Sequence, residues 1–100
     1  MSYRVLYAEQ FRRQLIEQLD YFDQEGAPRE RISNWLNELL LLMDGLEEAP
    51  LRFPVAIVES EIERIELRRA VFGRYLIFYH VHEEQREVQV YGFRHGARLP

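Results

Sequence analysis

The spacing of apolar residues divides the chain into a helical half and a strand-forming half. After Ala8, apolar residues recur every three or four positions, at Phe11, Leu15, Leu19 and Phe22. This spacing places them on one face of an amphipathic helix. Gly26 can end that helix and Pro28 suits the first turn of another, so we expect a loop of only about three residues between them. The pattern therefore predicts an antiparallel helical hairpin.

The second helix carries a wider apolar surface than the first. Its stripe consists of Ile32, Trp35, Leu36, Leu39, Met43 and Leu46. The neighbouring run 40–42 is all leucine and widens the stripe beyond what one sheet face needs. Two interpretations stay open: a helix that is well buried in a small domain, or a surface that awaits a partner. Gly45 and Pro50 end this helix, and the two prolines at 50 and 54 predict an irregular connector over Leu51–Pro54.

The second half of the chain alternates with a period of two, which is typical of strands. One strand runs from Glu63 to about Val71, a tight turn follows at Phe72-Gly73, and a mainly apolar strand covers 74–81. After a polar loop, 86–93 form a third strand. Its faces are predicted as Val88 and Val90 on one side, and Gln89, Tyr91 and Phe93 on the other.

Residues 3–7 have strand-forming chemistry and predict a short edge strand. The element order is then β-α-α-β-β-β, which is an α+β fold with a small antiparallel sheet packed against an N-terminal two-helix hairpin. One hundred residues are enough for one core, so residues 1–100 are expected to form a single domain. A content of 47% apolar residues excludes a disordered chain.

Composition restricts the possible chemistry. The chain has no cysteine, and its three histidines offer no ligand spacing beyond one i,i+2 pair, so neither a metal site nor a cofactor is expected. The first residues lack the apolar run of a signal peptide, and no later segment is long enough to span a membrane. We therefore expect a cytoplasmic protein that does not act at a membrane.

Charge is distributed unevenly along the chain. The net charge is −4, and every basic residue is arginine. Residues 1–50 hold five arginines against ten acidic residues, whereas residues 51–100 hold eight against seven. The negative total argues against general attraction to nucleic acid, and the basic character lies in the C-terminal half.

Six residues near the predicted strand ends form the main candidate site: Arg68, Arg69, Arg74, Arg94, His95 and Arg98. If they converge, their guanidinium groups could hold an anionic target. Together with a proton carrier they could also cut RNA without metal, and the set for that reaction is Arg69, Arg74, Tyr91, His95 and Arg98. The alternative is that these arginines pair with nearby glutamates on a solvated face.

The remaining candidates are weaker. His80 lies on an otherwise apolar strand face, which favours a hydrogen-bonded packing role over catalysis. His95 follows the last strand beside a glycine and two arginines, so a functional and a structural role stay equally open. No serine has histidine and aspartate companions at a recognisable spacing, and no glycine-rich phosphate loop is present.

Several of these blocks occur together in one known family. The chain contains Leu67-Arg68-Arg69, then Gly-Arg-Tyr-Leu-Ile-Phe-Tyr at 73–79, and His-Gly-Ala-Arg at 95–98, after the connector 51–54. This combination resembles the ParE/RelE family of toxins from bacterial type II toxin–antitoxin systems. The resemblance implies an α+β toxin that a small cognate antitoxin holds inactive. The predicted antitoxin contacts on the second helix are Trp35, Leu39, Leu40, Leu42 and Met43.

The two branches of this family imply different targets. The ParE-like branch inhibits DNA gyrase by binding and serves plasmid stabilisation, whereas the RelE-like branch cuts ribosome-bound messenger RNA without metal. The motifs at 73–79 and 95–98 look more like the ParE-like branch, and a chain without lysine and with negative net charge suits a ribosome-bound nuclease poorly. The six-residue candidate site would then bind the target. The sequence stops at Leu99-Pro100, where the family commonly continues, so a non-toxic homologue that only binds an antitoxin is the third interpretation.

Overall fold

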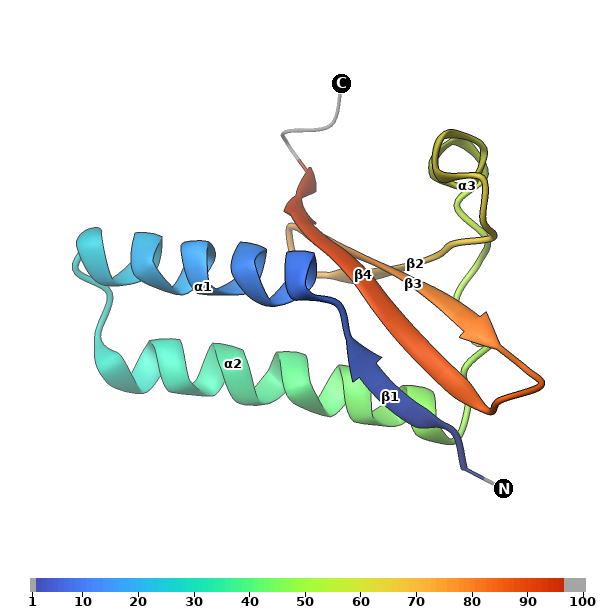
Figure 1. Ribbon diagram of the computed structural model, residues 1–100. Coiled ribbons are helices and arrows are strands. Elements are labelled where there is room, and N and C mark those ends of the chain that lie inside the picture. The colour runs from blue at the N-terminus through green and yellow to red at the C-terminus, as the bar shows by residue number, and fades with distance from the viewer. Residues whose placement is uncertain (1, 97–100) are drawn as a thin grey trace.

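A computed structural model describes residues 2–96 and shows a helical hairpin packed on one face of a four-stranded sheet (Figure 1). The elements in chain order are β1 (Arg4–Tyr7), α1 (Glu9–Gln24), α2 (Arg29–Asp44), the 3-10 helix η1 (Gly45–Glu47), α3 (Ile57–Glu63), β2 (Arg68–Phe72), β3 (Tyr75–His82) and β4 (Glu87–His95). The predicted α+β fold, with an N-terminal hairpin and a small sheet, is confirmed. The short helix α3 was not predicted.

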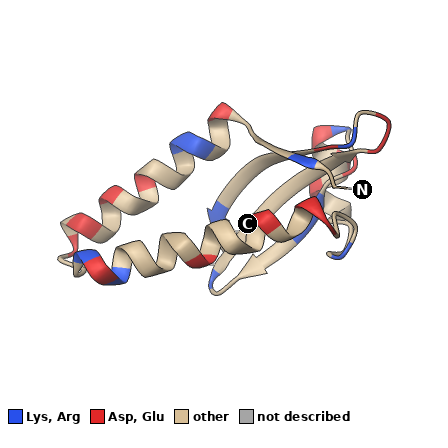
Figure 2. Ribbon diagram, turned by 90° about the horizontal axis from the view of Figure 1, so that it is seen from below, with Lys and Arg blue, Asp and Glu red and all other residues tan. Residues whose placement is uncertain are grey.

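The loop between the two hairpin helices lies where Gly26 and Pro28 predicted it. Gly26 has a φ of +79°, a left-handed conformation in which glycine carries no steric penalty. In the loop, Ala27 N donates to Phe22 O at 3.0 Å, and Pro28 has the extended conformation of a residue that precedes a helix. Figure 2 shows both signs of charge interspersed along α1 and α2, as expected for helix faces that point to water.

The sheet has the order β1-β4-β3-β2 and is mixed. β2, β3 and β4 form an antiparallel meander, whereas β1 lies at the edge and runs parallel to β4. The edge position of the first strand was predicted, but the fully antiparallel sheet was wrong for this pair. The direction of β1 depends on how the hairpin returns the chain to the sheet, and period-two alternation carries no information about direction.

A β-bulge in β4 reverses part of the predicted facing. Phe78 pairs with Gly92 and Tyr79 pairs with Val90, so Tyr91 is the extra residue. The bulge moves Phe93 to the side of Val90, where it is 3% exposed and packs in the core. The predicted position of Phe93 on the same face as Tyr91 was therefore wrong.

The main core lies between the hairpin and the sheet. Its buried residues include Phe11 of α1, Leu39 and Met43 of α2, and Ile77 and Val88 of the sheet. Trp35 extends this core through ring contacts at 5.0–5.9 Å with Phe22, Phe72, Tyr75 and Phe93. One face of the sheet is thereby covered by apolar and aromatic packing.

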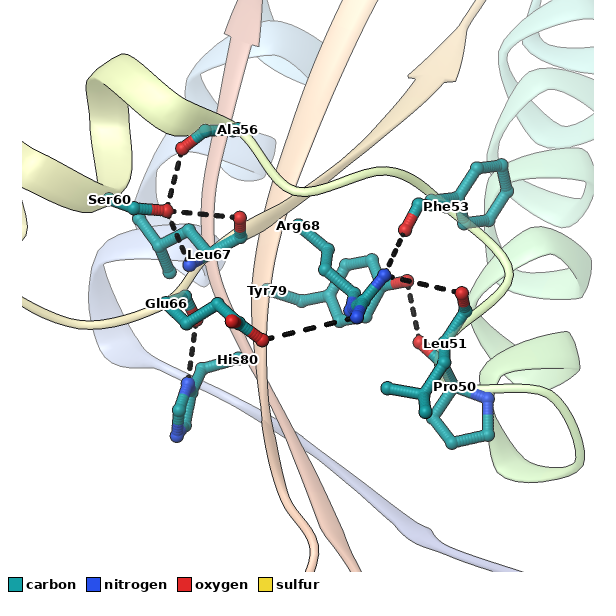
Figure 3. A network of polar contacts seen from close by, with 10 residues as sticks. All are labelled: Pro50, Leu51, Phe53, Ala56, Ser60, Glu66, Leu67, Arg68, Tyr79 and His80. Atoms are coloured by element: carbon teal, nitrogen blue, oxygen red, sulfur yellow. Dashed lines mark hydrogen bonds and ion pairs between the residues drawn. The ribbon is translucent and has the colours of Figure 1, made fainter.

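The connection from α3 to β2 is held by one serine (Figure 3). Ser60 Oγ donates to Ala56 O at 2.6 Å and accepts from Leu67 N at 2.8 Å. Arg64 has a φ of 57°, a left-handed turn that ends α3. These contacts explain why the strand begins at Arg68 and not at Glu63 as the alternation predicted.

Candidate functional site

A groove of about 690 Å³ lies on the face of the sheet that the hairpin leaves uncovered. The sheet contributes Phe78 and Tyr91, α3 contributes Val58 and Ile62, and the start of α1 contributes Gln10 and Gln14. Figure 1 shows α3 on the opposite side of the sheet from α2. The groove thus combines an aromatic floor with aliphatic and amide walls.

Two of the predicted arginines, Arg69 and Arg94, line this groove. The guanidinium carbon of Arg94 lies 4.6 Å from the ring centre of Phe78, and its Nη2 lies 3.1 Å from Glu59 Oε2. The ring and the carboxylate hold Arg94 in place and balance part of its charge. Arg69 is exposed, and within residues 2–96 no carboxylate lies at ion-pair distance from it.

Arg68 points away from the groove and toward the connector 51–54 (Figure 3). Its Nη1 donates to Phe53 O at 2.6 Å and to Leu51 O at 3.3 Å, and its side chain is 18% exposed. Glu66 adds a carboxylate at 3.9 Å. These bonds satisfy carbonyl oxygens of the connector, so Arg68 fastens the connector to the sheet.

His95 lies on the hairpin side of the sheet. It pairs across strands with Tyr75, and the two rings meet edge to face at 5.1 Å. Tyr75 in turn contacts Trp35 of α2 and stacks on Phe93. His95 is therefore separated by the sheet from Arg94 and Tyr91, which face the groove.

Arg74 and Arg98 complete the predicted set. Arg74 is exposed on the β2–β3 turn, where Gly73 has a φ of +60° and the Arg74 carbonyl accepts the amide of Gly96 at 2.7 Å. Arg98 lies outside the described residues. The structure thus brings together Arg69, Arg94 and Tyr91 from the candidates, and places Arg68, Arg74 and His95 elsewhere.

The residues predicted for antitoxin contact differ in exposure. Leu39 and Met43 are fully buried in the main core, and Trp35 belongs to its aromatic extension. Leu42 is partly buried, and Leu40 is 38% exposed. α2 therefore exposes the leucine run 40–42, called its leucine edge below, and not its whole apolar stripe.

Several exposed aliphatic side chains were not among the predicted contacts. Leu41 is 70% exposed, and it belongs to the leucine run 40–42 that was predicted to widen the stripe of the second helix. Ile57, Val58 and Ile62 of α3 are between 63% and 71% exposed. No periodic pattern assigned their segment to an element, although three aliphatic residues among glutamates are the signal that could have drawn notice.

Two tyrosines with shifted pKa values serve the core and not the groove. Burial raises the pKa of Tyr79, whose hydroxyl donates to Pro50 O at 2.7 Å. Burial also raises the pKa of Tyr7, with further upward contributions from the carboxylates of Asp44 and Glu47. Both tyrosines belong to the core on the hairpin face.

Among residues 2–96, no group of three or more histidine, cysteine, aspartate or glutamate side chains is arranged to hold a metal ion. No helix in the same range is long and apolar enough to cross a membrane.

The fold is that of toxins from type II toxin–antitoxin systems. The chain superposes on the archaeal RelE–RelB complex from Pyrococcus horikoshii OT3 with a TM-score of 0.61 and 19% identity, covering 99% of this chain and 100% of that chain. For the RelBE2 toxin–antitoxin complex from Mycobacterium tuberculosis the TM-score is 0.63 at 19% identity, with 95% and 99% covered. No curated protein sequence matches the chain.

A family model identifies the protein more closely. The model for the ParE toxin of the type II toxin–antitoxin system parDE matches residues 5–100. The chain belongs to this ParE toxin family. The family resemblance noted in the sequence is confirmed.

Proposed function

We propose that this toxin acts by binding and inhibiting DNA gyrase, and that the groove beside α3 is its contact surface. The observation that carries the proposal is the division of the polar candidates between the two faces of the sheet. Arg69, Arg94 and Tyr91 share the groove, whereas His95 packs against Tyr75 on the hairpin side. Membership of the ParE family supports gyrase as the target.

The separation of His95 from the groove arginines favours binding over RNA cleavage on chemical grounds. Cleavage needs a proton carrier within hydrogen-bond reach of the phosphate that the arginines hold. His95 is on the other side of the sheet, which leaves Tyr91 as the candidate proton carrier among the groove residues, and the charge of Arg94 is partly balanced by Glu59. An aromatic floor with a held arginine at its edge is instead a common form of protein-binding surface.

The antitoxin is proposed to cover the leucine edge of α2, where Leu40 and Leu41 are exposed and Leu42 lies beside them. Leu39, Met43 and Trp35 support this edge from the core side. Both structural neighbours are complexes of a toxin with its antitoxin, which supports a partner of the same kind here. A cytoplasmic role in plasmid stabilisation goes with this proposal.

Inhibition of supercoiling by purified gyrase tests the target. Wild-type protein is expected to inhibit at about one toxin per gyrase subunit, and Arg69→Ala to weaken inhibition about tenfold, as loss of an interface arginine does. Arg31→Ala, at an exposed position of α2, is the matched control and should inhibit like wild type. Normal supercoiling in the presence of folded wild-type protein would remove gyrase as the target.

A RelE-like ribonuclease is the second candidate, and one observation favours it. Tyr91 lines the same groove as Arg69 and Arg94, so this groove contains a hydroxyl group together with two guanidinium groups. On this alternative Tyr91→Phe abolishes cutting of ribosome-bound message while the fold is retained. If neither supercoiling nor message changes and the antitoxin still binds, the chain is a non-toxic homologue.

A further inference from the structure

The end of β3 carries two histidines that neither the groove nor the core explains. His80 and His82 are two positions apart, so their side chains leave the same face of the strand. Their ring centres are 4.3 Å apart and the rings are nearly perpendicular, at 82°. They line a hollow of about 540 Å³ that is separate from the groove.

The neutral form of the first ring is held in one tautomer. His80 Nδ1 lies 2.7 Å from the backbone oxygen of Glu66 (Figure 3). A carbonyl oxygen can only accept a hydrogen bond, so Nδ1 carries the proton and the neutral ring keeps its lone pair on Nε2. This is the support that metal-binding histidines usually have, with one ring nitrogen bonded to a carbonyl and the other left for the ion.

The separation of the rings fits a shared ion. Two imidazoles bound side by side, with metal–nitrogen distances of about 2.0–2.1 Å, place their ring centres roughly 4.5–5.3 Å apart. The observed 4.3 Å is close to the lower end of that range.

The charges around the hollow favour a cation. Three acidic side chains contribute to its lining: Glu66, Glu83 and Glu84. Arg68 also lines it and pairs with Glu66 at 3.9 Å, which offsets one of these charges. Glu83 and Glu84 leave the hollow with a net negative charge, which raises its affinity for a divalent ion.

We propose that His80 and His82 form a two-histidine site for a divalent transition-metal ion of the Ni²⁺, Cu²⁺ or Zn²⁺ class. Imidazole nitrogen selects these ions over Mg²⁺ and Ca²⁺, which prefer oxygen ligands. The chain supplies two nitrogen ligands, and water completes the coordination. The site has fewer than three protein ligands fixed in advance, which agrees with the absence of a larger ligand cluster in residues 2–96.

Isothermal titration calorimetry of the untagged full chain with NiCl₂, near neutral pH, tests the site. One Ni²⁺ is expected to bind per chain. His82→Asn and His80→Asn should each weaken binding about tenfold or more, because a second ligand on the same strand acts at high effective concentration. His95→Asn removes the third histidine of a chain without cysteine and should bind Ni²⁺ like wild type.

Three outcomes would overturn the proposal: no binding to wild type, unchanged affinity in His82→Asn, or a loss in His95→Asn alone. Thermal unfolding without metal shows whether each variant is folded. If His80→Asn does not fold because the bond to Glu66 is lost, His82→Asn still decides the question. Paramagnetic broadening of the histidine ring signals gives a second measure, expected at His80 and His82 and not at His95.

Discussion

The two faces of the sheet differ in how they are covered. Among residues 2–96, ten buried residues on the hairpin face form one cluster with aromatic rings around it. On the face toward α3, the corresponding cluster has three buried residues, Ala56, Leu67 and Phe78, and a groove with charged walls remains. Two helices of 16 residues cover the first face, whereas one helix of seven residues crosses the second.

This difference indicates that the two faces of the sheet have different roles. Each fully buried large apolar side chain contributes roughly 1.5–3 kcal/mol, so most of the stability comes from the hairpin face. The α3 face keeps arginines, amides and exposed aliphatic side chains because it does not have to exclude water completely. Substitutions on the two faces should therefore separate stability from binding.

The largest expected effect is in the core under α2. Leu39→Ala should lower the free energy of unfolding by about 2–5 kcal/mol, because a fully buried leucine leaves a cavity among rigid neighbours. Urea denaturation measures the change. Leu41→Ala, on an exposed position of the same helix, is the matched control and should change stability by no more than about 0.5 kcal/mol. Equal losses in the two variants would contradict the assigned orientation of α2.

The next effect concerns the anchor of α3. Ser60→Ala should cost about 1–3 kcal/mol, because the partly buried amide of Leu67 loses its acceptor. Faster hydrogen exchange at Leu67 would show that the loss is local to this connection. Ser33→Ala, at an exposed position of α2, controls for removal of a hydroxyl. If Ser60→Ala leaves both stability and exchange unchanged, the serine does not hold the connection.

Tyr79 should show a smaller effect that depends on pH. Tyr79→Phe removes the hydroxyl that donates to Pro50 O, at a cost of about 0.5–1.5 kcal/mol near neutral pH. Burial raises the folded-state pKa of Tyr79 above its ordinary value of 10.0. Its contribution is thus complete below pH 10.0 and declines as pH rises through the interval up to the folded-state pKa.

Denaturation of both proteins across this alkaline interval measures the pH dependence. Wild type should lose stability more steeply than Tyr79→Phe, whereas the exposed Tyr21→Phe control should follow wild type. Parallel curves for wild type and Tyr79→Phe would show that this hydroxyl does not cause the loss of stability at alkaline pH.

The smallest effect is expected on the groove side. A double-mutant cycle of Arg94→Gln and Glu59→Gln should give a coupling energy of about 0.2–1 kcal/mol, because the pair is partly exposed to water. Salt should reduce the coupling. A coupling of several kcal/mol would mean that this ion pair is a structural element like those of the hairpin face.

The helical hairpin and the strands could be read from the sequence because they depend on local chemistry. The spacing of Phe11, Leu15 and Leu19 defines a helix face whatever the helix packs against. Gly26 and Gly73 supply left-handed backbone at the two turns where the chain needs it. The family motifs lie on these same elements, so the class of protein was also accessible from the sequence.

The site was predicted less completely because facing depends on register. The bulge at Tyr91 shifts the last part of β4 by one residue, which moves Phe93 into the core and leaves Tyr91 at the groove. Arg68 and Arg69 are neighbours in the chain, yet one binds the connector and the other lines the groove. A list of arginines near strand ends cannot distinguish these roles.

The order of the main elements, the hairpin, the turns and the toxin family could be predicted because periodicity, glycine and proline act within a few residues. The parallel pairing of β1 with β4, the short helix α3, and the separation of His95 from Arg94 could not be predicted in this way. Those features arise from contacts between segments far apart in the chain, such as the bond from Ser60 to Leu67 and the pairing of Tyr75 with His95. Such contacts set which side chains share a face, and the groove depends on that arrangement.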